Sequence, residues 1–559
     1  MKHAKREESQ AIERFQFSDE IEEENEQEIE ELEIEQKPSF INRRVIQIVA
    51  NIIIVFIVGY FYNHYISAMG ALPSSILHIA YFIFIMTSAY LFISINYLLQ
   101  KKDYELEKLF LIVMIPVSIA YSLIMIPGMV PDEATHMRLT YSLASQIMGV
   151  EQDKITLRGE EKYIYEHLPQ SPILESYDYS YTHFFSGEDN GNYVTIDEGS
   201  ANWKQIFGYF PAVFGVIFAR VMHFGATPTI YLARLCNLFF YLWVAYFAIR
   251  KIPIGKQLLF VIAILPMCSQ QMMSLSYDAV LNAATFFCLA YGLFFVYNSE
   301  EVRFDEYIKY LFSAILLLSI KSSIYAFILL IPLLSKFKNL GDNIKIERKQ
   351  KIILVLSISF FIFILNFVSF GNTTKATTET AATTTNIISW SGTEGYTIGW
   401  LLTHPIEGIM LFINTVSVKG EWYFYSCLGQ DLSWFTVKLP MGLFKIWGTL
   451  LLVCALKKEE NQLDQRSRLL FVIINTIVFL LVLLSMCIYW TPLTFNYIEG
   501  VQGRYFIPIV FTLLIVLNNK KVSIREHVYR YVNVFACILT AITVITLLNA
   551  CFMQGGIAA

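Results

Sequence analysis

Charged side chains are scarce in this chain of 559 residues. Asp, Glu, Lys and Arg make up 16% of it, against 55% hydrophobic residues, and the mean hydropathy is +0.49. Soluble globular domains carry about 25% charged residues, so the composition excludes that class and indicates a polytopic membrane protein. The net charge of -5 comes largely from the N-terminal tail and says little about partners of the membrane body, and nucleic acid is not expected as a ligand.

Several sequence signals are also missing. No two of the eight cysteines have Cys-x-x-Cys spacing, so neither a zinc site nor a disulfide framework is expected. There is no glycine-rich nucleotide loop, and the polar leader contains no short apolar core of a signal peptide. Most cysteines fall inside apolar runs, where a thiol behaves as a small hydrophobe. These are Cys236, Cys268, Cys288, Cys454, Cys487 and Cys537.

The chain begins with an acidic segment, residues 1–40. Glutamate dominates Glu20 to Glu35, and this run accounts for much of the net charge. Its few apolar residues are too sparse to bury a face, which predicts a disordered or singly helical cytoplasmic tail. The alternative is a short coiled-coil segment that binds a partner.

Apolar stretches of membrane-spanning length recur along the rest of the chain. They lie at about 46–66, 75–99, 109–130, 229–249, 257–275, 279–297, 352–370, 440–456, 469–489, 504–518 and 531–551. Together with two half-length segments near residues 310–334, they predict an all-α bundle of about thirteen transmembrane helices.

Lysine and arginine placement predicts the orientation of these helices. Arg43 and Arg44 precede the first span and Lys101 and Lys102 follow the second, whereas the connection 63–74 has no basic residue. Basic loops stay on the cytoplasmic side, so the N-terminus is expected inside and the C-terminus outside. Four later basic loops should also lie inside, at 250–256, 336–351, 457–468 and 520–530.

Two segments do not fit a simple count of spans. Ile206 to Phe224 is apolar but short and contains Pro211. If it crossed the membrane, the basic loop at 250–256 would lie outside. This argument, which we call charge parity, favours a juxtamembrane or re-entrant helix. Tyr310 to Leu334 is interrupted at Lys321, which predicts a hairpin of two short helices with Lys321 at its tip. The alternative for this second segment is one long tilted helix whose lysine reaches toward the interface.

Three loops then become extracytoplasmic, at 131–205, 371–440 and 490–504. The first opens with Pro131-Asp132-Glu133 and His136, and the third contains Gln502-Gly-Arg504-Tyr505. The second holds a threonine-rich tract, 373–385, and an expected interfacial helix at 398–416. Residues 41–518 are expected to form one transmembrane module, followed by a cytoplasmic loop and a last span in 519–559.

The first loop is rich in aromatic residues. Aromatic faces stack on the C–H surfaces of sugars, which suits a glycan, although interfacial belts use the same residue types. The residues are Tyr163, Tyr165, Tyr177, Tyr179, Tyr181 and Trp203.

Each candidate functional residue also has a structural interpretation. Asp132 can cap a helix over 134–146, with Glu133 favourable beside the helix dipole, and Asp278 can cap the sixth span. Arg504, at a helix mouth, can hold an anionic head group such as a phosphate or simply anchor its helix. Lys321 inside the membrane needs an anion or a water-filled cavity.

Several separated motifs, in this order, resemble the bacterial membrane-protein family called domain of unknown function 2142. The resemblance covers roughly residues 40–518, although Ser-Ser follows Lys321 where the family often has proline. It is carried by Pro131-Asp-Glu-x-x-His136, Arg234-Leu-x-Asn237, the Leu-Ser-Tyr-Asp run ending at Asp278, the break at Lys321, and Gln502-Gly-Arg-Tyr-Phe506.

The resemblance implies a GT-C glycosyltransferase, a multi-span enzyme that takes sugar from a polyprenyl-phosphate carrier. Its first large outer loop would carry the acidic catalytic motif, so Asp132 is expected as general base, with Glu133 orienting the acceptor or assisting. Either carboxylate could help hold a divalent cation, Mg or Mn, but the absence of an Asp-x-Asp pair leaves metal dependence open. The residues expected around the donor or its phosphate are Arg504, Lys321, His136, Arg234, Asp278, Gln502 and Tyr505.

The expected partners are the polyprenyl-phosphate donor, a cell-envelope glycan acceptor and the lipid bilayer of the bacterial plasma membrane. Two alternatives share these features: a polymerase or ligase of lipid-linked glycans, and a flippase or transporter of lipid-linked saccharides. The sequence contains no inverted repeat or matched pair of broken helices of the kind that many transporters have.

Overall fold

The structure, a computed structural model, describes residues 40–68, 73–100, 103–151, 153–187, 192–297, 303–336, 353, 360, 386–459, 463, 465–518 and 528–554. The chain divides into two units, residues 1–65 and 66–559. Most of helix α2 (Phe40–Ala68) belongs to the first, and its apolar part is Asn51–His64. All other helices and strands belong to the second unit. The predicted acidic tail lies outside the described residues, apart from residue 40.

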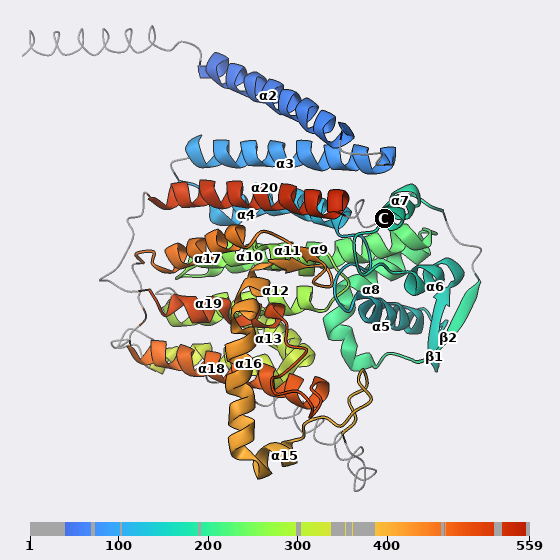
Figure 1. Ribbon diagram of the computed structural model, residues 1–559. Helices are drawn as coiled ribbons and strands as arrows, with labels where there is room; N and C mark the ends of the chain where they lie inside the picture. The colour runs from blue at the N-terminus through green and yellow to red at the C-terminus, as the bar shows by residue number, and fades with distance from the viewer. Residues whose placement is uncertain are drawn as a thin grey trace, which may run out of the picture. The chain divides into compact units, whose positions relative to one another are not determined.

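Six described helices are long and apolar enough to cross a membrane, which confirms a helical, multi-pass fold. α20 packs on α3 and α4, α4 packs on α9, and α9 packs on α12 (Figure 1). Each helix matches a predicted span, whereas the expected total of about thirteen is not confirmed. The six are α3 (Ser74–Gln100), α4 (Leu106–Ile124), α9 (Ala226–Lys251), α12 (Asp278–Tyr297), α18 (Gln465–Trp490) and α20 (Val528–Gln554).

Other predicted spans are short or broken in the structure. The segment 257–275 is not one helix, because α10 (Lys256–Ala263) ends just before Pro266, where α11 (Pro266–Met272) begins. Proline has no N–H to continue the α-helical ladder and clashes with the preceding turn, so the helix restarts there. The spans predicted at 440–456 and 504–518 are α17 (Met441–Ala455) and η3 (Gly503–Phe506) with α19 (Ile507–Ile515). The span predicted at 352–370 lies outside the described residues, except for positions 353 and 360.

The chain reverses direction at Lys321, as the sequence predicts. α13 (Phe304–Tyr325) has non-helical torsions at Lys321, φ -145° and ψ 55°, and the 3₁₀ helix η2 (Ala326–Lys336) follows. The Lys321 ammonium lies over the ring of Tyr277, next to the start of α12. Further along, a Cβ on Gly292 of α12 would lie 3.3 Å from Ile331 of η2. The second arm therefore returns along α12, although the first arm is longer than expected.

Residues 125–225, between α4 and α9, form a folded region that we call the cap. An apolar core that includes Met137, Leu157 and Val216 joins its elements to α9. β1 and β2 pair antiparallel, with Thr156 opposite Thr195. Its elements are α5 (Glu133–Ile147), β1 (Lys154–Arg158), α6 (Gly159–Glu166), α7 (Leu174–Thr182), β2 (Tyr193–Gly199), η1 (Trp203–Gln205) and α8 (Ile206–Val221).

Helix α8 is the apolar segment that charge parity removes from the count of spans. It has sixteen residues and is not among the six span-length helices. A Cβ on Gly215 would lie 2.6 Å from the Cα of Ala233, so glycine allows α8 to approach α9 closely. The helix therefore packs as part of the cap.

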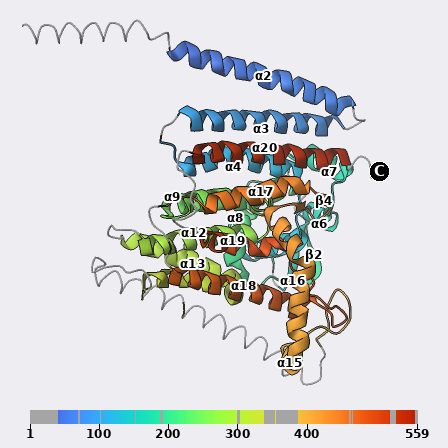
Figure 2. The ribbon, with the colours of Figure 1, turned by 60° about the vertical axis from the view of Figure 1, so that its left-hand side comes forward.

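The predicted interfacial helix at 398–416 is longer and is broken. α15 (Ile398–Thr403) ends at His404, and α16 (Pro405–Leu428) starts with Pro405, which is favourable at a first helical position. In both ribbon views α16 runs steeply across the direction of α18 (Figures 1 and 2). The two-residue strands β3 (Asp431–Leu432) and β4 (Val437–Lys438) follow, and the threonine-rich tract lies outside the described residues.

The described basic loops gather at the end of the bundle away from the cap. Lys256 pairs with Glu107 at 2.7 Å, and Lys251 pairs with Glu306. The Asn518 amide, after α19, donates to the Lys457 carbonyl at 2.6 Å. α4 and α9 run between this end and the cap, so the two predicted basic loops at 250–256 and 457–468 share one end in their described residues.

Candidate functional site

The loop that leads to the acidic pair is buried and held in place. α4 ends at Ile124 rather than near residue 130, because Pro127 and Gly128, with φ +96°, cannot continue a helix. Tyr177 donates its hydroxyl to the carbonyl of Ile124 at 2.6 Å, and Tyr181 donates to that of Leu123 at 2.7 Å. These bonds satisfy carbonyls that a helix end leaves unpaired.

Glu133 is fully buried and every polar position around it is occupied. Its Oε1 accepts hydrogen bonds from Arg234 Nε at 2.8 Å and from the Leu275 amide at 3.1 Å. Its Oε2 accepts from Arg234 Nη2 at 2.9 Å and from the Gly128 amide at 2.8 Å. Arg234 also donates to the Met125 carbonyl at 2.8 Å. Glu133 and Arg234 therefore bind each other and nearby backbone groups, and together they fasten α5 to α9.

Asp132 has the opposite surroundings. It holds the N-cap position of α5 in a left-handed conformation, φ 65° and ψ 8°, but its side chain makes no capping bond. Instead, Oδ2 accepts a hydrogen bond from Arg504 Nη2 at 2.5 Å, and the side chain is 45% exposed. Aspartate is among the few residue types that adopt this backbone region readily. The exposed carboxylate of the pair is thus Asp132.

Arg504 is buried against this carboxylate. Its Nη1 donates to the Pro131 carbonyl at 3.3 Å, and its Nε lies 3.7 Å from Asp278 Oδ2. Within the described residues Nε has no hydrogen-bond partner. The preceding Gly503 lets η3 lie against α16, since a Cβ there would be 2.2 Å from the Cys427 amide nitrogen. The Nε edge of the guanidinium therefore faces Asp278 at ion-pair distance but without a hydrogen bond.

Asp278 and Lys321 complete the charged group. Asp278 opens α12, and its side chain is 11% exposed beside Arg504. The Lys321 ammonium lies 5.6 Å from the ring centre of Tyr277, near enough for its charge to act on Asp278 and His136. Asp132, His136, Asp278, Lys321 and Arg504 form what we call the central cluster. Its two carboxylates and two cations balance.

His136 is the neutral member of the central cluster. Burial lowers its pKa to about 3, and the charges of Arg504 and Lys321 act in the same direction, against Asp132. Its Nδ1 lies 2.7 Å from the Tyr209 hydroxyl, and its ring meets Tyr277 edge-on at 5.2 Å. The imidazole therefore stays uncharged at physiological pH and packs between two phenol rings.

The structure also places the remaining predicted residues and adds new ones. Tyr505 is half-buried, and its carbonyl accepts from Tyr325 at 2.8 Å. Gln502 has a buried Oε1 without a hydrogen-bond partner among the described residues. Tyr209 was not expected at the site, because nothing in the sequence links α8 with a histidine 73 residues earlier. Tyr277 lies inside a recognised motif but had no predicted role.

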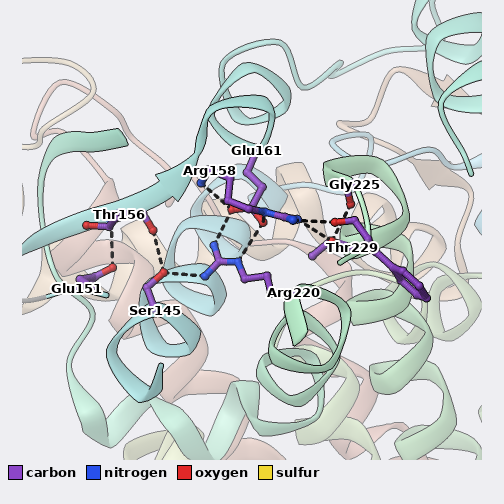
Figure 3. Close-up of polar contacts among 9 residues, drawn as sticks. Ser145, Glu151, Thr156, Arg158, Glu161, Arg220, Gly225 and Thr229 are labelled. Atoms are coloured by element: carbon purple, nitrogen blue, oxygen red, sulfur yellow. Dashed lines mark hydrogen bonds and ion pairs between the residues drawn. The ribbon is translucent and has the colours of Figure 1, made fainter. Parts of the chain in front are cut away.

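A second buried charge network holds the cap together (Figure 3). Glu161 is fully buried between two arginines, bonded to Arg158 Nε at 2.7 Å and to Arg220 Nη2 at 2.5 Å. Arg220 also donates to Ser145 at 2.9 Å. Burial would raise the pKa of Glu161, but the two guanidinium groups hold it below its usual value. The network ties α6 to α8.

The aromatic residues of the cap fall into two groups. Tyr177 and Tyr181 are structural, since their hydroxyls hold the end of α4. Tyr163, 48% exposed, lies beside Tyr179, with ring centres 5.8 Å apart. Trp203 is also exposed. Only part of the predicted aromatic set can therefore meet a glycan.

Three of the four carboxylate oxygens of the acidic pair accept hydrogen bonds from protein donors. Glu133 has both oxygens committed to Arg234 and two amides, and Asp132 faces Arg504. Among the residues that the structure describes, no three His, Cys, Asp or Glu side chains lie close enough together to hold a metal ion. We therefore route no chemical step through a metal held by this pair.

Comparison with known proteins identifies a family. No curated protein and no solved structure matches the chain. The model of one family, described as "Predicted membrane protein (DUF2142)", matches residues 116–513, which include the cap, the Lys321 turn and Arg504. The chain therefore belongs to this family of predicted membrane proteins.

Proposed function

We propose that this protein is an integral-membrane glycosyltransferase of the GT-C type. It transfers a sugar from a polyprenyl-phosphate donor to a hydroxyl of a cell-envelope glycan, on the extracytoplasmic face of a bacterial plasma membrane. One observation carries the proposal: Asp132 is a partly exposed carboxylate beside a buried, incompletely bonded guanidinium at one end of a membrane-spanning bundle.

In this reaction Asp132 is the general base. The acceptor O–H gives its proton to the carboxylate as the oxygen bonds to the anomeric carbon of the donor sugar. The bond from that carbon to the phosphate oxygen breaks, and the electron pair leaves with the polyprenyl phosphate. Arg504 and Lys321 stabilise the departing anion. Where water is excluded, cations strongly stabilise the negative charge that develops on the leaving group in the transition state. Glu133 and Arg234 act as positioning residues.

The distribution of charge supports the extracytoplasmic side. The basic loops gather at the end opposite the cap, and positively charged loops remain in the cytoplasm. A polyprenyl-linked donor also places its phosphate at the interface and its tail in lipid, which suits a cluster at the ends of spans.

The experiment is reconstitution of the purified full-length protein with radiolabelled polyprenyl-phosphate sugar and a cell-envelope glycan acceptor. The wild type should release polyprenyl phosphate and label the acceptor, and Asp132→Asn should lower transfer at least about a hundredfold. Asp132→Asn should still insert and express normally. Full activity of this variant would refute the assignment of the base.

The same assay separates the other two candidate functions. Growth of a lipid-linked chain would identify a polymerase or ligase. Movement of the labelled lipid between leaflets without a change in bonding would identify a flippase. Either result would replace the proposal.

A further inference from the structure

The cap contains a cleft that the central cluster does not use. It lies between α6 and α7, has a volume of about 410 Å³, and reaches the first turn of α9 at Thr227 and Ile230. Pockets of a few hundred cubic ångströms are the size that binds small molecules or parts of larger ones. No role in the proposed transfer reaction depends on it.

Aromatic faces form one side of this cleft. His167 stacks on Tyr163 with ring centres 4.2 Å apart, and Tyr163 is followed by Tyr179 at 5.8 Å. The His167 ring is fixed further, since its Nδ1 lies 2.8 Å from the Tyr163 carbonyl oxygen. Ordered aromatic surfaces that remain accessible provide flat apolar platforms, which fit the C–H faces of sugar rings.

The polar lining is acidic or neutral. Glu175 and Ser176 lie at the start of α7, and Ser180 one turn further along. Among the described residues that line the cleft, none is Lys or Arg. A carboxylate and hydroxyls accept hydrogen bonds from sugar hydroxyl groups, whereas a phosphate or carboxylate on the ligand would meet like charge.

The cleft also borders the loop that leads to the central cluster. Pro127 lines it, and Pro127 precedes Asp132 by five residues, at most about 18 Å of chain. Leu168 packs on Gly128 so closely that a Cβ there would lie 2.7 Å away, and the Gly128 amide donates to Glu133. A ligand in the cleft therefore touches the loop that positions the acidic pair.

We infer that this cleft binds a neutral saccharide segment of the acceptor glycan. The role as acceptor subsite rests on the proposed transferase function, but the binding of the saccharide does not. Because Pro127 is at most about 18 Å of chain from Asp132, an acceptor long enough to reach both would be favoured over a single sugar.

The binding test uses the full-length Asp132→Asn protein in lipid nanodiscs without a sugar donor, so that no transfer accompanies binding. Saturation-transfer NMR is recorded with maltotriose, cellotriose and chitotriose as neutral probes and trigalacturonate as the anionic probe. At least one neutral trisaccharide should bind, and Tyr163→Ala or Tyr179→Ala should weaken that binding about fivefold or more. Tyr163→Phe keeps the ring and should bind within twofold. Phe185→Ala removes a cap aromatic that is 92% exposed and outside the cleft, and it should change nothing.

Binding of no neutral probe would overturn the inference, as would neutral binding that survives the double variant Tyr163→Ala/Tyr179→Ala. Equal binding of trigalacturonate would overturn the preference for neutral sugars. In a transfer assay on the otherwise wild-type chain, Tyr163→Ala should raise the KM for the acceptor and leave kcat unchanged. Saccharide binding combined with full transfer by Asp132→Asn would instead retain the cleft and reject the proposed base.

Discussion

At the scale of single residues, the acidic pair shows how neighbouring side chains acquire different roles. Asp132 adopts a left-handed backbone, so its carboxylate turns away from the helix it precedes and meets Arg504. Glu133 is the first helical residue and points into the interior, where Arg234 binds both of its oxygens. The sequence cannot rank the two carboxylates, whereas their burial can.

Glu133→Gln should therefore destabilise the protein. The change leaves the Arg234 guanidinium buried without its counter-charge, and breaking a buried ion pair in this way costs about 3–5 kcal/mol. Thermal unfolding in detergent should show a clearly lower midpoint than for the wild type. Asp197→Asn is the matched control and should keep the wild-type midpoint, because Asp197 pairs with Lys154 at 92% and 58% side-chain exposure. An inactive Glu133→Gln protein of normal stability would instead place Glu133 in the chemistry.

His136 should make the folded state sensitive to acid. Its pKa is lowered to about 3 by burial and by Arg504, so between about pH 6.5 and 3 the unfolded chain binds a proton that the folded chain does not. The stability that comes from the neutral imidazole is complete above pH 6.5 and falls by up to about 1.4 kcal/mol per pH unit below it. The difference in unfolding free energy between the wild type and His136→Gln should therefore shrink as the pH is lowered from 7 to 5. A difference that stays constant over this pH range would contradict the lowered pKa of His136.

Much of the central cluster could be predicted from the sequence. Asp132, Asp278, Lys321 and Arg504 are charged residues at the ends of apolar runs, where burial is costly and a reason is needed. The structure brings them together with His136. Which charged residues pair with each other could not be predicted, because the ion pair between Arg234 and Glu133 depends on how α9 is rotated against α5. Tyr209 was missed for the same reason.

At the scale of elements, prolines explain where sequence-based boundaries failed. Apolar runs predict where a chain is buried, and they did locate α3, α9, α12, α18 and α20. They do not show where the backbone stops being helical inside a buried segment. Pro127 ends α4 early, Pro266 divides α10 from α11, and Pro405 separates α15 from α16. In each case the chain remains in the predicted region but changes direction or helical phase.

The buried network around Glu161 should be essential for the cap. Glu161→Gln removes the anion between Arg158 and Arg220 and leaves two buried cations, at a cost of about 3–5 kcal/mol. Limited proteolysis should then cleave residues 125–225 faster, while the spans stay protected. Lys154→Ala is the control, because Lys154 pairs with Asp197 at 58% and 92% side-chain exposure, where ion pairs contribute little. Equal cleavage of both variants would argue against a structural role.

At the scale of the whole molecule, the second unit has one basic end and one end that carries the cap. Charge parity predicts this separation without knowledge of any contact, because the positive-inside rule depends only on the order of spans and loops. The membrane side that each end faces remains a prediction of the sequence.

Chemical labelling of intact cells should establish the orientation. Phe185→Cys introduces a thiol at a fully accessible position of the cap, and Lys458→Cys does so at an exposed position of the basic end. The native cysteines give little background, since seven of the eight are buried. A membrane-impermeant maleimide should label Phe185→Cys directly and Lys458→Cys only after permeabilisation. The reverse pattern would place the central cluster in the cytoplasm.

The distances along the chain between bonded residues impose an order on biosynthesis. Glu133 meets Arg234 101 residues later, but Asp132 meets Arg504 only after a further 270 residues. Segments of a growing chain become available from the N-terminus onward. The ion pair between Glu133 and Arg234 can thus form as soon as α9 has been inserted. Asp132 can pair with Arg504 only after nearly the whole chain has been synthesised. The nascent cap can therefore be stabilised early, and Asp132 acquires its cation only when synthesis is almost complete.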